Sequence, residues 1–153
     1  MDEPAAGWER LPSWLLTQTA GHAQRLVGDG FAAVQARGYH FRLLATLERF
    51  GPASQADLGR RSGIHLSDMV AAINELADRG LVERTPDPAD RRRNTITLTA
   101  AGRRQLRRLE KRLAQTQDEL LAPLTPEERQ RLTELLARLL DHHNGRAEGS
   151  RPG

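Results

Sequence analysis

The chain has 153 residues, enough for one domain with a buried core, and 38% of them are hydrophobic while 28% are charged. This balance excludes a typical disordered or low-complexity chain. Because the sequence contains no cysteine, it has no disulfide framework, thiolate zinc site or iron–sulfur cluster. It also contains no run of the roughly 20 apolar residues that span a bilayer, and no apolar leader follows its acidic start, so we expect a cytoplasmic protein.

Positive charge is concentrated in one part of the chain. The net charge is only +3, and all 23 basic residues except Lys111 are arginines. Residues 84–112 hold ten basic and three acidic side chains, which gives +7 there and −4 over the remainder. An arginine excess alone fits a GC-rich genome, but this uneven distribution is compatible with a surface that binds nucleic acid.

The first third of the chain favours helices. Residues 12–36 carry apolar side chains among helix-favouring residues, with Gly28 and Gly30 as weak interruptions, and predict one or two helices. Residues 39–50 repeat apolar side chains every three or four positions and predict a further helix of about three turns.

Residues 54–80 have the pattern of a helix-turn-helix. A cap is predicted at Ser54, followed by a short helix over 55–61 and a turn at Gly63. A second, amphipathic helix is predicted over 64–79. In such a pair the second helix is the candidate to enter the major groove of DNA.

Two strand patterns follow, over 81–85 and 95–98. The segment between them contains two prolines, two aspartates and three adjacent arginines, and it cannot continue a ladder. We predict a hairpin with a long, stiffened loop that is tipped with arginine. A hairpin in this position after a helix-turn-helix is called a wing.

The last part of the chain predicts two long helices. Thr99 caps the first, which runs to residue 122. Thr125 and Glu128 form a capping box that starts the second. One face of the second helix consists of leucines, at positions 132, 135, 136, 139 and 140. Such a face needs an apolar partner, either a second copy of the chain or the rest of the monomer.

The order of these elements and two local motifs resemble the MarR family of transcriptional regulators. Residues 87–93, Asp-Pro-Ala-Asp-Arg-Arg-Arg, resemble the family's wing signature. Residues 98–102, Leu-Thr-Ala-Ala-Gly, resemble its entry to the next helix, and residues 79–84 resemble the join between the recognition helix and the wing. The resemblance covers about residues 12–142, nearly the whole chain.

The resemblance implies a mainly α fold with a small β-hairpin, in which a winged helix-turn-helix lobe is joined to a helical dimerisation layer. It also implies a homodimer that binds a pseudo-palindromic operator in double-stranded DNA as a repressor. A single domain is then expected over 12–143, with the winged core at 39–98, dimerisation helices at 12–36 and 99–143, and flexible tails at 1–11 and 144–153.

The family geometry further implies which residues contact DNA. At least one wing arginine is expected in the minor groove, with Asp90 holding a guanidinium through a bidentate pair. Ser67 and Asp68 are expected at base edges, although Asp68 has the alternative role of complementing the helix dipole. For Val70 the favoured alternative to a base contact is a buried core position. For His65 the favoured alternative is an exposed position without DNA contact. The predicted DNA-binding residues are Ser54, Gln55, His65, Leu66, Ser67, Asp68, Arg84, Asp90, Arg91, Arg92 and Arg93.

A small phenolic or anionic effector is another implication of the family. All six aromatic residues lie within the first fifty positions, and an apolar slot with polar handles is expected from Trp14, His22, Tyr39, His40 and Arg42. The alternative is that the aromatic side chains fill the core. The histidines lack a metal-binding motif, and the chain contains no nucleophile elbow or phosphate loop. We therefore expect no metal, no cofactor and no enzymatic activity.

A protein-interaction module is an alternative function that stays open. A winged helix can use its recognition face to dock a protein and bind no specific DNA, and Asp68, Val70 and Ala71 on that face favour this alternative. Three adjacent arginines on a stiff loop favour DNA instead, although a solvated run of charge is a further interpretation of them.

Overall fold

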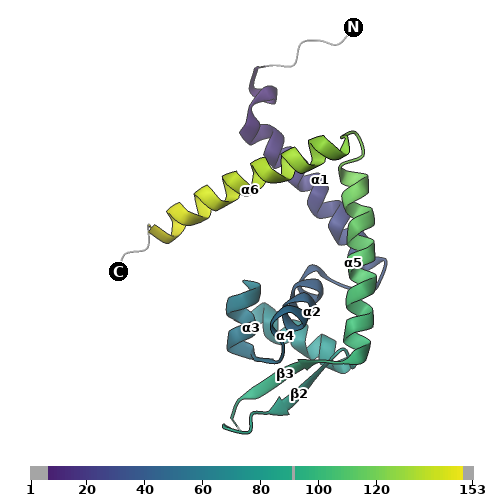
Figure 1. Ribbon diagram of the computed structural model, residues 1–153, viewed down its shortest axis with the longest axis vertical. Helices are drawn as coiled ribbons and strands as arrows, with labels where there is room; N and C mark the ends of the chain where they lie inside the picture. Colours follow the sequence, from purple (N-terminus) through teal and green to yellow (C-terminus); the bar gives the residue numbers. More distant parts are fainter. Residues whose placement is uncertain (1–6, 91, 150–153) are drawn as a thin grey trace. The chain divides into compact units, whose positions relative to one another are not determined.

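The computed structural model describes residues 7–90 and 92–149, which fold mainly into helices with one small sheet (Figure 1). The chain forms two compact units, Met1–Thr116 and Gln117–Gly153. The expected mainly α fold with a β-hairpin is confirmed. The elements in chain order are η1 (Gly7–Arg10), α1 (Pro12–Ala32), α2 (Gly38–Phe50), β1 (Ala53–Ser54), α3 (Gln55–Ser62), α4 (Leu66–Asp78), β2 (Val82–Pro86), β3 (Asn94–Leu98), α5 (Ala100–Leu120) and α6 (Pro126–Gly149).

The predicted helix-turn-helix is formed by α3 and α4. Ser54 caps α3, because its hydroxyl oxygen accepts a hydrogen bond of 3.2 Å from the Asp57 N–H. Gly63 ends α3 in the left-handed region, with φ of 68°, and Gly80 follows the end of α4 with φ of 69°. α4 begins at Leu66, two residues later than predicted.

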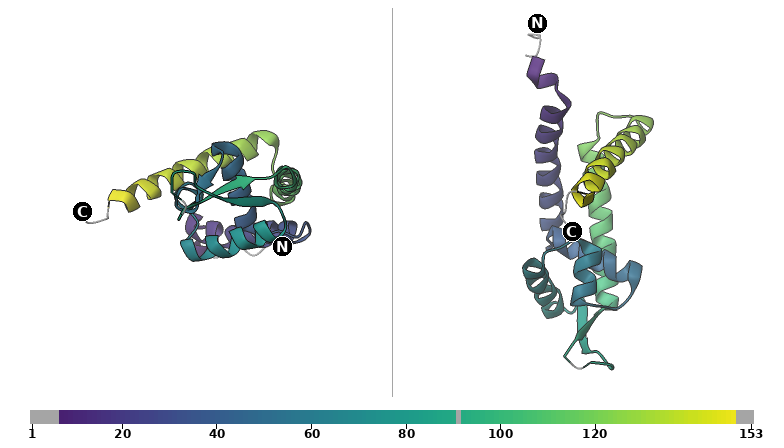
Figure 2. Two further views of the ribbon diagram at one scale, coloured as in Figure 1. Left: turned by 90° about the horizontal axis from the view of Figure 1, so that it is seen from below. Right: turned by 90° about the vertical axis from the view of Figure 1, so that its left-hand side faces the viewer.

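The sheet has the strand order β1-β3-β2, and both pairs are antiparallel. β2 and β3 form the predicted hairpin, which Figure 2 shows from two further sides. β1 has only two residues, and the sequence pattern does not predict it. It pairs Ala53 with Ile96 and Ser54 with Thr95, so the start of α3 is held beside the hairpin.

The core of the first unit forms where α2, α3, α4 and α5 meet β3. α1 joins it through Phe31, whose ring stacks on Phe41 with 5.7 Å between the ring centroids. In the described residues no helix is long and apolar enough to cross a membrane. The largest apolar side chains that are fully buried in this core are Leu43, Leu44, Leu58, Met69, Ile73, Leu76, Ile96, Leu106 and Leu109.

The start of α5 is fixed to the base of the hairpin. The Thr99 hydroxyl accepts from the Gly102 N–H at 3.0 Å and donates to the Gly80 carbonyl at 2.7 Å. Gly102 packs against the Leu81 carbonyl, and a Cβ at this position would lie 2.6 Å from the Leu98 side chain. The Leu-Thr-x-x-Gly motif therefore combines a helix cap with a close contact that only glycine permits.

In the second unit α6 begins at the predicted capping box. The Glu128 carboxylate accepts from the Thr125 N–H at 3.0 Å, and the Thr125 hydroxyl accepts from the Glu128 N–H at 3.2 Å. Arg129 donates to the Asp118 carboxylate at 2.9 Å, which ties the start of α6 to the last turn of α5.

The expected flexible tails are wrong in part. Residues 144–149 continue α6, because a single glycine at position 145 costs a helix only about 1 kcal/mol. Residues 7–10 form η1, in which Trp8 packs edge to face on Trp14 with 5.3 Å between the ring centroids. Leu11 is the N-cap residue of α1, and the remaining expected tail residues, 1–6 and 150–153, lie outside the described residues.

Candidate nucleic-acid interface

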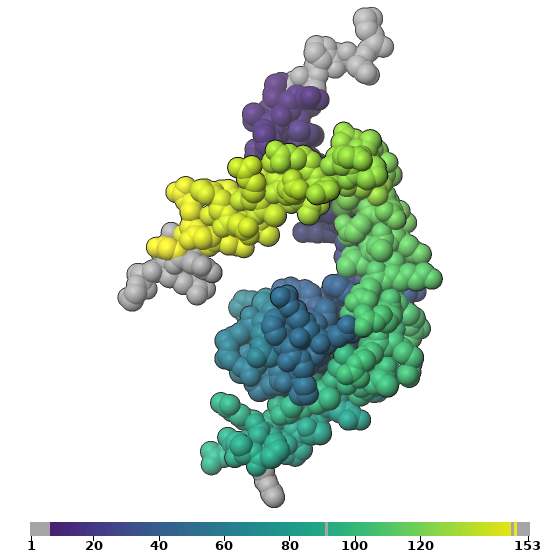
Figure 3. Space-filling model, viewed as in Figure 1, coloured from purple at the N-terminus to yellow at the C-terminus, as the bar shows by residue number. Residues whose placement is uncertain are grey.

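A shallow groove of about 430 Å³, called the wing groove below, lies between the start of α3, the first turns of α4 and the hairpin. The pairing of β1 with β3 produces this arrangement, since it holds α3 beside the hairpin. Figure 3 shows the hairpin extending beyond the helices of the first unit. The lining residues are Ser54, Gln55, Ala56, Leu66, Val70, Arg92, Arg93 and Asn94, so five of the predicted DNA-binding residues share one surface.

The exposed face of α4 is centred on Ser67. At about 100° per residue, Ser67 and Asn74 share the middle of this face. Leu66, which is 65% exposed, and Val70 lie on the edge towards the wing groove. Asp68 lies on the other edge and lines a small pocket beside the start of α2. The predicted base-contacting residues Ser67 and Asp68 are therefore both exposed, but they point in different directions.

Val70 is not a core residue. Its side chain is 40% exposed, whereas the neighbouring Met69 is fully buried. The core interpretation of Val70 is wrong because one helical step turns this side chain about 100° away from the buried face. Val70 and Leu66 together give the wing groove an apolar wall. The His65 side chain is exposed at the N-cap of α4 and makes no capping hydrogen bond.

Asp90 organises the wing loop through backbone hydrogen bonds. Its carboxylate accepts from the Arg92 N–H at 3.0 Å, and its carbonyl accepts from the Arg93 N–H at 3.0 Å. The expected pair between Asp90 and a guanidinium is formed neither by Arg92 nor by Arg93; the bond described for the Asp90 carboxylate is the one from the Arg92 N–H. Arg91 lies outside the described residues.

Arg84 joins the hairpin to α4. Its guanidinium donates to the side-chain oxygen of Asn74, in the middle of the exposed face of α4. Arg84 is exposed, so this bond places a positive charge beside that face. The sequence prediction omits Asn74, because its partner is ten residues away on another element and no local pattern links the two.

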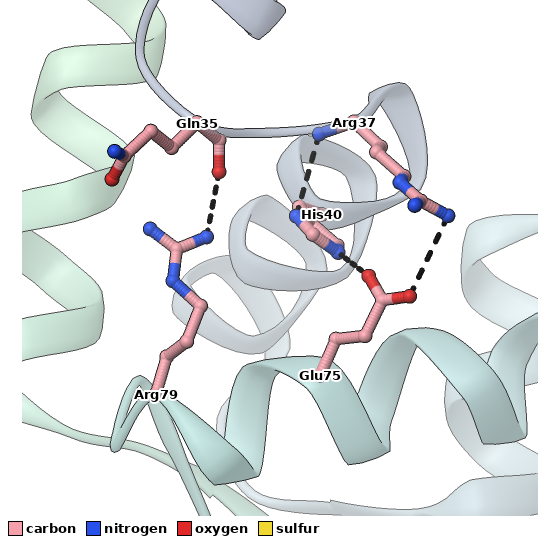
Figure 4. A network of polar contacts seen from close by, with 5 residues as sticks. All are labelled: Gln35, Arg37, His40, Glu75 and Arg79. Carbon is pink, nitrogen blue, oxygen red and sulfur yellow. Dashed lines mark hydrogen bonds and ion pairs between the residues drawn. The ribbon is translucent and has the colours of Figure 1, made fainter.

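A polar network behind α4 joins this helix to the segment between α1 and α2 (Figure 4). The Glu75 carboxylate accepts from the buried His40 ring at 2.8 Å and pairs with Arg37 at 3.5 Å. The Arg37 N–H donates to the other ring nitrogen of His40 at 3.3 Å, which assigns the ring hydrogen to Nε2. Arg79 adds a bond of 2.7 Å to the Gln35 carbonyl. The network fixes α4 from the side opposite the wing groove.

The five predicted effector residues do not share one pocket. The His40 ring is hydrogen-bonded to Glu75 in the network behind α4. Trp14 lies about 20 Å along α1 from the nearest part of the slot that Tyr39 lines, and His22 is exposed. In residues 7–90 and 92–149 no group of three or more histidines and carboxylates could hold a metal ion. Tyr39 and Arg42 do line an apolar slot of about 490 Å³, together with Val27, Phe31, Arg37, Gly38, Phe41 and Leu113.

The helix pair α3–α4, the hairpin beside it and the strand order β1-β3-β2 define a winged helix-turn-helix protein. A sequence profile described as "MarR family" matches residues 34–93, which contain α2, α3, α4, β2 and the loop that follows β2.

Known proteins of this class are similar over most of the chain. A crystal structure of a Pseudomonas aeruginosa protein, described as a probable transcriptional regulator, is 30% identical, with 86% of this chain and 98% of that chain covered and a TM-score of 0.74. The transcriptional repressor CouR, bound to a 23-mer DNA duplex, is 27% identical, with 92% and 99% covered and a TM-score of 0.77. A curated relative of Bacillus subtilis, the uncharacterized HTH-type transcriptional regulator YdgJ, is 30% identical over 67% of this chain. The match spans 62% of the length of YdgJ.

The chain belongs to the MarR family of transcriptional regulators, as its wing and helix-entry motifs predict. These relatives are regulators of transcription, in agreement with the expectation that the chain is not an enzyme.

Proposed function

We propose that the chain is a sequence-specific DNA-binding repressor that acts as a homodimer. The observation that carries this proposal is the wing groove, which residues of α4 line together with Arg92 and Arg93 of the wing loop. Among the described residues neither arginine side chain has a hydrogen-bond or ion-pair partner, so both charges are available to phosphate oxygens. The similarity to CouR, a repressor bound to DNA, supports the same function.

The arrangement suits one docking geometry. With α4 in the major groove, Ser67 faces base edges and Val70 contacts thymine methyl groups. Arg92 or Arg93 enters the adjacent minor groove, and Arg84, oriented by Asn74, contacts a phosphate. The other predicted contacts stay predictions: Ser54, Gln55, His65, Leu66, Asp68, Asp90 and Arg91.

A second copy of the chain is the partner that we propose for the apolar face of α6. Four leucines on this helix, at positions 135, 136, 139 and 140, are between 39% and 61% exposed. Exposed apolar faces of this kind mark interfaces. Two lobes related by a two-fold axis bind a pseudo-palindrome whose half-sites lie about 34–36 Å apart.

Removing the wing charges tests the DNA interface. We expect the double variant Arg92→Ala, Arg93→Ala to bind the DNA upstream of the protein's own gene more weakly. Because each lost phosphate contact removes one released counterion, the slope of log affinity against log salt should become shallower by about one to two. Footprinting locates the site, and fluorescence anisotropy over a salt series measures both quantities.

Arg138→Ala is the matched control for this test, because Arg138 is an exposed arginine on α6 without a side-chain partner among the described residues. It should leave affinity and salt slope unchanged. The proposal is contradicted if the double variant also behaves like the wild type. A wild type that binds all DNA weakly and with little salt dependence favours the protein-docking alternative.

We also propose that the apolar slot takes a small aromatic anion. The Tyr39 and Phe41 rings supply the apolar walls, and Arg37 and Arg42 supply positive charge. Benzoate or salicylate should raise the melting temperature of the wild type and release it from DNA, whereas Tyr39→Ala should lose both responses. His22→Ala, outside the slot, should keep them. If a panel of aromatic carboxylates gives no shift with the wild type, the slot has another role.

A further inference from the structure

One face of α5 is basic over the first three turns of the helix. At 100° per residue its exposed basic side chains fall within about 140° of the helix circumference. The opposite side of the same turns is buried in the core through Leu106 and Leu109. The exposed residues, called the α5 basic face below, are Arg103, Arg104, Arg107, Arg108 and Lys111.

Only one residue of the α5 basic face has an acidic partner within the described part of the chain. The Arg107 guanidinium bonds to Glu48 on α2 at 2.6 Å and to Glu110 at 2.7 Å, and these bonds raise the pKa of Arg107 above its ordinary value. The other four side chains make no hydrogen bond or ion pair with described residues. Elsewhere in the first unit several arginines do donate to protein oxygens, as in Arg42, Arg60, Arg79 and Arg84.

The unpaired charges are unfavourable for the helix itself. Arg103 and Arg104 lie near the N-terminus of α5, where the helix dipole is positive. Arg104 and Arg108 are four residues apart, as are Arg107 and Lys111, and like charges at this spacing repel. An anionic partner would remove this repulsion.

We propose that the α5 basic face binds phosphates of DNA that flanks the core operator. The inference rests on the proposed function and extends its footprint. DNA is favoured over an acidic protein because the α5 basic face is attached directly to the wing: α5 begins two residues after the end of β3, and Thr99 ties it to the base of the hairpin.

The geometry of α5 suits a phosphate backbone. From Arg103 to Lys111 the helix is about 12 Å long, which corresponds to about three phosphates along one strand of DNA. Figure 3 shows the outer side of this part of α5, in green, uncovered by the other elements of the first unit. A stiff helix presents these charges with little loss of backbone entropy on binding.

Two DNA duplexes test the inference. One carries only the footprinted core, and the other carries the same core with about one helical turn of DNA, ~10 base pairs, added on each side. The full-length wild type should bind the longer duplex at least about tenfold more tightly at low salt, with a salt slope steeper by about two. The triple variant Arg104→Ala, Arg108→Ala, Lys111→Ala should lose this difference and keep its affinity for the core.

A charge-conserving variant separates charge from structure. Arg104→Lys, Arg108→Lys, Lys111→Arg should retain the preference for the longer duplex, and circular dichroism should show that all variants are folded. The inference is overturned if the alanine variant keeps the full preference, or if the wild type has none although it binds the core. If the wild type does not bind the core at all, the proposed function fails and the inference fails with it.

Discussion

Gly102 lies against the backbone carbonyl of Leu81, and a Cβ at this position would also come within 2.6 Å of the Leu98 side chain. Because a backbone carbonyl moves less easily than the end of a flexible side chain, Gly102→Ala should lower the free energy of unfolding by about 1–3 kcal/mol. This cost outweighs the gain in helix propensity of up to about 1 kcal/mol. Urea unfolding followed by circular dichroism measures the change.

Gly145→Ala provides the control, since Gly145 lies within α6 and no atom outside its own helix turn comes within 4 Å of a Cβ built there. This substitution should leave the stability unchanged or raise it by about 0.5–1 kcal/mol. Equal changes in the free energy of unfolding at the two positions would show that the close contact does not restrict position 102 to glycine.

Single residues were predictable from sequence where their role is local. Ser54, Thr99 and Thr125 cap helices as expected, because a cap depends only on residues two or three positions away. The hydrogen bond from the Arg92 N–H to Asp90 was not predicted, because a carboxylate can accept from a guanidinium or from a nearby N–H, and which of them reaches it depends on how the loop closes. Val70 shows the same limit, since its apolar character fits both a core and an exposed apolar wall.

At the scale of elements, the helices and the hairpin follow from periodicity and turn residues, whereas their mutual contacts do not. β1 is too short to have a pattern, yet its pairing with β3 forms the wing groove. His40 and Glu75 lie 35 residues apart, so neither residue signals that together they hold α4 in place. For this reason the predicted effector residues are not brought together in one pocket: Tyr39 and Arg42 line the apolar slot, whereas the His40 ring bonds to Glu75 and does not line it.

For the whole molecule, the exposed leucines of α6 are the feature that a monomer does not explain. The helix is 24 residues long and begins at a capping box, yet its leucines at positions 135, 136, 139 and 140 are exposed. These four leucines share one face with Leu132, as the sequence predicts. A second copy would cover this face and would bring two wing grooves to one DNA site.

Leu139→Glu tests this assembly. Leu139 is 48% exposed, so the substitution should be tolerated by the fold, but a carboxylate in an apolar interface would be buried without a partner. We expect a monomer by light scattering after gel filtration where the wild type is a dimer. Affinity for the operator should fall roughly 100-fold or more, because two linked lobes bind with avidity. Arg138→Glu places the same side chain off the leucine face and should remain dimeric; a dimeric Leu139→Glu variant would show that the α6 leucines serve another partner.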